Sequence, residues 1–245
     1  IYGGTLIANI TDFDSHVSGN TSVPNNYTFQ WYLSSNSNMS GATSERICNA
    51  TSRSYMIGSD LATGTDCIDG SKAIFKDKYI YVLVTVQKDN YTKVYKDIAD
   101  GTDTDGDAST GSDKVLPKPI TVTAGSQTKT YDGIELKVNS CSVTTGSLLV
   151  PKTGTIHAVS CVMTDASKIT NAGSVNNVIS TTTIKYGTTD LTGNYSITKA
   201  NGKLTINQKA VTITAKEQTI TYGESIAQGT SYVTVDGLLN EHTLT

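Results

Sequence analysis

The sequence has little charge and no long apolar run. Only 17% of its 245 residues are charged, the net charge is −3 and the sequence pI is near 5.6. Such a chain offers no basic surface for nucleic acid or anionic lipid. No apolar stretch approaches the roughly 18 residues of a transmembrane helix, so no membrane insertion is expected in this segment.

Helical patterns are equally scarce. No window of about twelve residues places apolar side chains at helical spacing. Ser and Thr instead make up 64 residues, about a quarter of the chain. This composition predicts an all-β fold. Seven Asn-X-Ser/Thr sequons follow from the same composition and begin at Asn9, Asn20, Asn26, Asn38, Asn49, Asn90 and Asn194.

Catalytic motifs are missing as well. The three histidines, His16, His157 and His242, do not stand at metal-ligand spacing from other ligating residues. We expect His157 to lie on one face of a strand as a structural residue. No nucleophile elbow, P-loop or dinucleotide-binding glycine run occurs. The sequence therefore predicts a protein that is not an enzyme and needs no cofactor.

One acidic stretch is the weak candidate for a cation site. The candidate ligands are Asp103, Asp105 and Asp107. An EF-hand loop would need ligands where the sequence has Gly101 and Ser112. We therefore predict a solvated acidic linker over 101–116, with calcium as the weaker alternative.

An internal repeat organises the C-terminal half. Residues 120–133 (ITVTAGSQTKTYDG) return 91 positions later as 211–224 (VTITAKEQTITYGE), with seven of fourteen positions identical. Each copy opens with β-branched and polar residues in alternation and then places a Tyr against a turn. A period near 90 residues suits tandem β-domains.

Further strands are expected on both sides of this repeat. Before it they cover 5–10, 27–33 with Trp31, 53–57, and 79–86 with 91–98 as its hairpin partner. After 120–124 they cover 134–143, 155–163, 177–185, 195–199 and 203–206. Asn201-Gly202 predicts a hairpin between the last two. The tail, residues 209–245, should hold strands near 211–215, 218–222 and 231–235, but not enough of them to complete a sheet.

The four cysteines have local spacings. We predict that Cys48 pairs with Cys67 and that Cys141 pairs with Cys161. Such disulfides require an oxidising compartment. The alternative is four buried, reduced cysteines.

Several motifs carry a resemblance to bacterial surface proteins. TLIANI, FQWY, NATSRSYMIGSDL and KYIYVLVTV in 1–100 resemble the Ig-like domain common in large Gram-positive surface proteins. KTYDG, TNAGS, LTGNYSIT and NGKLTI in 117–208 resemble the YDG-type domain. The repeat in 209–245 resembles the opening of an MBG domain of the YGX type, truncated here. The chain departs from these patterns in its cysteines and in an enlarged 34–78 region.

This resemblance implies tandem Ig-like or β-sandwich domains in an elongated rod, with 101–116 as linker. It implies a non-enzymatic extracellular stalk or adhesin segment at the cell surface or cell wall, with neighbouring repeats as partners. Because the chain starts at Ile1 without a signal peptide, we expect a fragment of a longer secreted precursor.

Two alternatives remain open. The Ig-like domain could bind a host ligand, a mucin glycan or an immunoglobulin-like surface protein, through the 34–78 region, because insertions on rigid scaffolds often carry binding. Deleting 62–78 should then remove binding and leave 117–208 folded. The weaker alternative is a set of accessory modules in a secreted polysaccharide-degrading enzyme.

Overall fold

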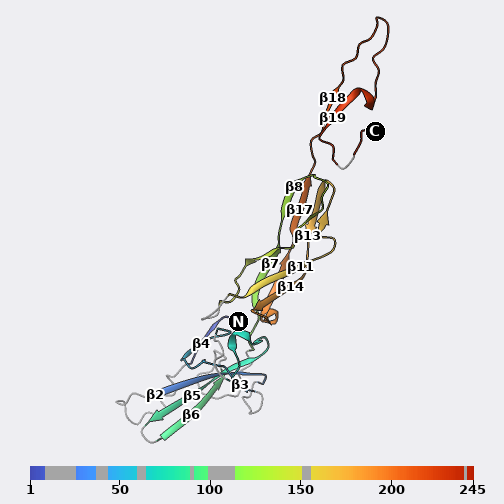
Figure 1. Cartoon of the computed structure of the whole chain (residues 1–245). Coiled ribbons are helices and arrows are strands. Elements are labelled where there is room, and N and C mark those ends of the chain that lie inside the picture. Colours follow the sequence, from blue (N-terminus) through green and yellow to red (C-terminus); the bar gives the residue numbers. More distant parts are fainter. Residues whose placement is uncertain are drawn as a thin grey trace. The chain divides into compact units, whose positions relative to one another are not determined.

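The computed structural model describes residues 1–8, 26–36, 44–59, 65–88, 91–98, 114–150, 156–239 and 242–245. Within these ranges the protein is nearly all β, which confirms the predicted class (Figure 1). The described residues include no α-helix. They include the short 3₁₀ turns η2 (Gly70–Lys72), η3 (Thr192–Asn194) and η4 (Thr230–Tyr232). The rod-like arrangement of domains stays a prediction.

The chain divides into two compact units. Unit 1 comprises Ile1–Val122, Val143–Ser160 and Thr182–Thr198. Unit 2 comprises Thr123–Ser142, Cys161–Thr181 and Lys199–Thr245.

A four-stranded antiparallel sheet organises the first part of unit 1. Its strand order is β3 (Ser44–Arg46), β2 (Asn26–Ser34), β5 (Tyr79–Lys88) and β6 (Tyr91–Ile98). The predicted hairpin between 79–86 and 91–98 is therefore confirmed. The β-branched residues that alternate along β5 are buried, namely Ile80, Val82 and Val84.

Trp31 anchors the core beside this sheet. Its side chain is 1% exposed, and its ring centroid lies 5.8 Å from that of Tyr55. The indole Nε1 donates a 2.9 Å hydrogen bond to the Ser52 carbonyl, which satisfies the one polar atom of the buried ring. Tyr55 lies in β4 (Ser54–Met56), which pairs antiparallel with β1 (Thr5–Ile7).

Residues 117–208, hereafter the second module, form several short sheets. Their strands are β7 (Lys118–Ala124), β8 (Gln127–Thr130), β9 (Leu136–Lys137), β10 (Cys141–Thr145), β11 (Ala158–Met163), β12 (Lys168–Ile169), β13 (Gly173–Asn177), β14 (Ile179–Tyr186), β15 (Thr189–Asp190), β16 (Tyr195–Ala200) and β17 (Gly202–Asn207). The sheet orders are β10-β7-β16, β11-β14-β15, β12-β9 and β13-β17-β8. β17 runs antiparallel to β13 and parallel to β8.

The hairpin predicted at Asn201-Gly202 is wrong. β16 and β17 belong to different sheets, so the chain continues from one sheet into the next instead of turning back. A two-residue type I′ turn would need positive φ at both positions, and neither residue has it. Gly202 is required for another reason, because a Cβ there would collide with the carbonyl oxygens of Ala124 and Gly125.

The tail contains a two-stranded antiparallel sheet, β18 (Thr212–Ala215) and β19 (Val233–Asp236) (Figure 1). These strands confirm the first and third predicted ones, whereas the strand predicted at 218–222 is wrong. The equivalent strand of the second module, β8, has β17 as its partner.

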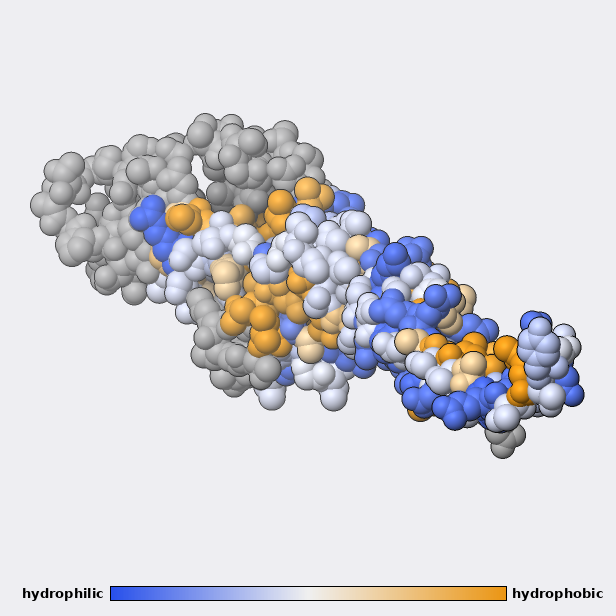
Figure 2. All heavy atoms as spheres, turned by 90° about the horizontal axis from the view of Figure 1, so that it is seen from above, coloured by the Kyte–Doolittle hydropathy of each residue, from blue (hydrophilic) through white to orange (hydrophobic). Residues whose placement is uncertain are grey.

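Figure 2 shows hydrophobic side chains, in orange, at the surface among hydrophilic ones. The exposed large hydrophobic residues of the tail are Val211, Ile213, Ile220, Tyr222, Ile226, Tyr232 and Leu238.

Candidate functional site

A buried aromatic cluster lies within unit 1. Its members are Tyr2, Phe75, His157 and Tyr195, and none is more than 6% exposed. The Tyr2 ring centroid lies 5.8 Å from Phe75, 5.6 Å from Tyr195 and 6.4 Å from His157. Segments far apart in the sequence therefore meet around the ring of Tyr2.

His157 precedes β11 and is fully buried. Its Nδ1 lies 2.7 Å from the Tyr195 hydroxyl, which also accepts a 3.0 Å bond from the Leu149 amide. Burial lowers the pKa of His157 to about 4 and raises the pKa of Tyr195 to about 12. Both groups are therefore neutral at pH 7. A general base needs a pKa near the working pH and access to substrate, so this pair suits a packed core better than catalysis.

The side chain of Asn194, in the same unit, is hydrogen-bonded to backbone groups of 73–76. We call this set of hydrogen bonds the Asn194 bracket. The Asn194 side chain is completely buried, and its Oδ1 accepts hydrogen bonds from the amides of Phe75 at 2.7 Å and Lys76 at 3.4 Å. Its Nδ2 donates to the Ala73 carbonyl at 2.8 Å. The amide thus satisfies backbone groups about 120 positions away in the sequence. This sequon is a structural element, since Nδ2 is both buried and engaged.

The 34–78 region, which the family resemblance predicts to be an enlargement, is packed against other segments in the part that the structure describes. Phe75 is fully buried against Tyr2, and Asn194 holds the backbone on either side of it. At the end of the predicted linker, Val115 is buried and exchanges backbone hydrogen bonds with 77–78. These contacts argue against the expectation that deleting 62–78 leaves 117–208 folded, because the deletion would uncover Tyr2 and remove the hydrogen-bond partners of Asn194.

Both predicted disulfides are present. Cys48 is joined to Cys67 with a Cα–Cα distance of 5.1 Å. Cys141 in β10 is joined to Cys161 in β11 with a Cα–Cα distance of 6.1 Å. Neighbouring sheets of the second module are thereby cross-linked. Disulfides of this kind form and persist in oxidising compartments.

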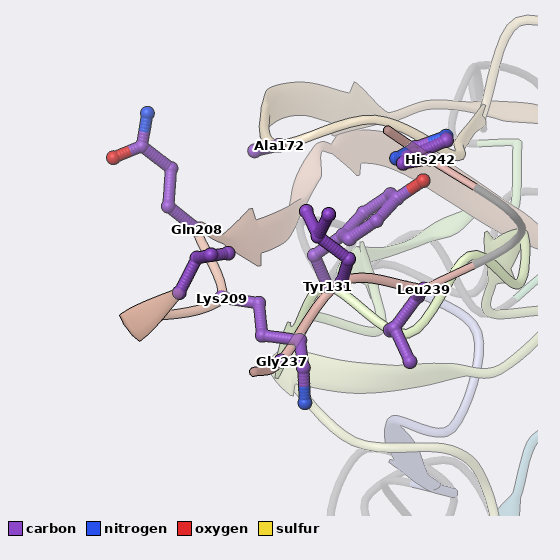
Figure 3. Close-up of a pocket in the computed structure, with 9 residues that line it drawn as sticks. Tyr131, Ala172, Gln208, Lys209, Gly237, Leu239 and His242 are labelled. Carbon is purple, nitrogen blue, oxygen red and sulfur yellow. The ribbon is translucent and has the colours of Figure 1, made fainter. Parts of the chain in front are cut away.

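A cavity of about 320 Å³ lies in unit 2, where the second module ends and the tail begins. Figure 3 shows the rings of Tyr131 and His242 side by side, and their centroids are 6.2 Å apart at 18°. The Gln208 amide points away from both rings (Figure 3). Among the described residues that line the cavity, none is Asp, Glu or Cys. Its volume suits a small ligand, but the stacking already covers one face of Tyr131.

The remaining site residues that the sequence suggested belong to neither the aromatic cluster nor the cavity. Asp103, Asp105, Asp107 and His16 lie outside the described residues. Elsewhere in the described chain, no group of three or more His, Cys, Asp or Glu is placed to hold a metal ion. The same ranges contain no helix that is long and apolar enough to cross a membrane.

No protein-family model matches the chain, and neither the curated proteins nor the solved structures yield a match. The resemblance to Ig-like, YDG-type and MBG-type domains therefore rests on the sequence motifs.

Proposed function

We propose that this chain is a non-enzymatic, load-bearing repeat segment of an extracellular bacterial surface protein, acting as a stalk or adhesin segment. The observation that carries the proposal is the parallel pairing of β8 with β17. Within the sheet β13-β17-β8, β8 comes first along the chain and β17 comes last. The chain enters this module just before β7 and leaves it at the end of β17.

The pairing loads its hydrogen bonds in shear. The register runs from Gln127 opposite Leu204 to Thr130 opposite Asn207, and the Tyr131 amide adds a 2.8 Å bond to the Asn207 carbonyl. Tension on the two ends pulls β8 towards its start and β17 towards its end. Parallel strands then slide past each other, so their bonds must break together and not one after another.

Two further features support a load-bearing role. The disulfide between Cys141 and Cys161 fixes two sheets of the same module covalently, and it shortens the chain that force can extend. The Asn194 bracket ties the 73–76 backbone to the segment before β16, inside unit 1. Both features hold distant segments of the chain together under tension, and neither provides a side chain for a chemical reaction.

Single-molecule force spectroscopy on the whole chain tests the proposal. Azide-bearing residues at exposed Leu116 and Gln208 would attach handles that pull the second module end to end. Handles at exposed Gln127 and Lys203 would instead pull β8 and β17 apart from one end, like a zipper. We expect the end-to-end geometry to need at least about twice the force at equal loading rate, since forced unfolding follows the unfolding barrier.

The two geometries use the same fold, so each is the matched control of the other. Equal unfolding forces would show that the parallel pair bears no load. An end-to-end trace with no resolved unfolding event of this module would contradict the proposed function directly.

A further inference from the structure

The two ends of residues 1–116, hereafter the first module, lie side by side. The Tyr2 amide donates a 2.8 Å hydrogen bond to the Leu116 carbonyl, although the two residues are separated by almost the whole module. Both residues belong to the same compact unit. The chain therefore passes into and out of the first module at one place. We call this place the seam and define it as residues 2–4 together with 115–116.

The Tyr2 side chain fixes the seam to both modules. On the side of the first module its ring lies against Gly58, where φ is +87° and a Cβ would collide with the ring. On the side of the second module the ring centroid lies 5.6 Å from Tyr195 and 6.4 Å from His157. Because Tyr2 is 1% exposed, pulling it away from the seam would bring a buried aromatic ring into water.

The backbone of the seam is held by few hydrogen bonds. Next to Tyr2, the Gly3 amide donates to the Ile57 carbonyl at 3.2 Å, and the Ile57 amide donates to the Gly4 carbonyl at 2.9 Å. In the second module, by comparison, β8 and β17 are paired along the whole of β8. Tension that reaches the seam should therefore open it before the parallel pair of the second module breaks.

We infer that tension applied at residue 1 bypasses the first module while the seam is closed, and that opening of the seam then releases this module as a reserve of length. The closed seam passes force from Tyr2 to Leu116 and to the ring of Tyr195, so the sheet β3-β2-β5-β6 is not stretched. The open seam leaves the first module loaded from its two ends. This inference rests on the proposed load-bearing function and gives the two modules different roles in it.

Force spectroscopy on the whole chain tests the inference with handles at Ile1 and Gln208, which are both exposed. The first event should lengthen the chain by about 340 Å, since roughly 95 residues become extensible outside the loop that Cys48 and Cys67 close. It should need no more than about half the force of the second-module event. Handles at Leu116 and Gln208 are the matched control. They should give no event of that length, because the covalent path between them leaves out the first module.

Substitutions at Tyr2 test whether the seam sets the force of the first event. Tyr2→Ala should lower that force by at least about half, because it removes the buried ring. Tyr2→Phe keeps the ring and should retain the force. Ile7→Ala is the control in the same segment, since Ile7 is 67% exposed and should leave the force unchanged. The fluorescence of Trp31 shows whether each variant is folded before it is pulled.

The order of the two events decides the outcome in the unsubstituted protein, even where a variant fails to fold. Release of the first module after the second module would overturn the inference. A first event whose force is the same in folded Tyr2→Ala would overturn it as well. Neither outcome changes the result of pulling between Leu116 and Gln208, so failure of the seam is distinguishable from failure of the load-bearing role.

Discussion

The Asn194 bracket permits a quantitative prediction about unfolding. Asn194→Ala removes the acceptor of the Phe75 amide at 2.7 Å and the donor to the Ala73 carbonyl at 2.8 Å. Each buried backbone group left without a partner costs about 1–3 kcal/mol. The two short bonds therefore predict a loss of about 2–6 kcal/mol in the free energy of unfolding. The 3.4 Å bond to Lys76 is too long to add much.

Urea unfolding of the whole chain measures this loss. The fluorescence of Trp31, the single tryptophan, reports on unit 1, which also holds Asn194. Asn176→Ala is the matched control, because that asparagine is exposed on β13 and should change stability by less than about 0.5 kcal/mol. A loss of the same small size for Asn194→Ala would refute the bracket.

Two more predictions concern the disulfide and the buried histidine. Replacing Cys141 and Cys161 by Ala should cost about 3 kcal/mol in the chain-entropy model for their separation of 20 residues, measured by urea unfolding, and a cost under about 1 kcal/mol would contradict it. The pKa of His157 is lowered to about 4, so the unfolded chain takes up a proton between about pH 6.5 and pH 4 that the folded chain does not. Stability should therefore fall by about 2–3 kcal/mol over that window and should not recover at lower pH. His157→Gln should flatten the difference between pH 7 and pH 5, and an unchanged slope in that variant would exclude His157 as the cause.

Local patterns in the sequence were sufficient for three strands of the first sheet, β2, β5 and β6, but not for β3. In β5, β-branched residues alternate with others, so burial of one face follows from the period of a strand, and Ile80, Val82 and Val84 are buried. The pairing of Cys48 with Cys67 followed from spacing in the same way. These features depend on neighbours along the chain, and the sequence displays those directly.

Sheet membership could not be predicted because it depends on distant neighbours. Asn201-Gly202 carries the local signal of a tight hairpin, yet Gly202 is there to let the carbonyls of Ala124 and Gly125 approach. Both needs select glycine, so the sequence alone does not distinguish them. The absent strand at 218–222 has a similar cause, because Gln218-Thr219 matches β8 while β8 depends on β17 for pairing.

The Asn194 bracket was missed for a different reason. Its partners are backbone groups of 73–76, and a backbone group leaves no mark in the sequence. The available signal was the motif LTGNYSIT, in which Asn194 and the cluster residue Tyr195 are adjacent. The sequence analysis attributed Asn194 to the high Asn, Ser and Thr content of the chain. In the structure this side chain is fully buried, so its position is fixed by the packing.

The shortage of charge and the wealth of Asn, Ser and Thr have one structural consequence in common. Where strands break or change sheets, uncharged polar side chains satisfy backbone groups: Asn177 donates to the Gly125 and Val138 carbonyls at 2.9 Å each, and Ser167 accepts from the Val178 amide at 2.8 Å. Burying such groups costs far less than burying ions. Asn194 uses the donor and the acceptor of its amide at once, which a charged carboxylate or ammonium group cannot do. Asn177, at the start of a predicted strand, and Ser167, outside the predicted strands, therefore both hold strand breaks of this fold together.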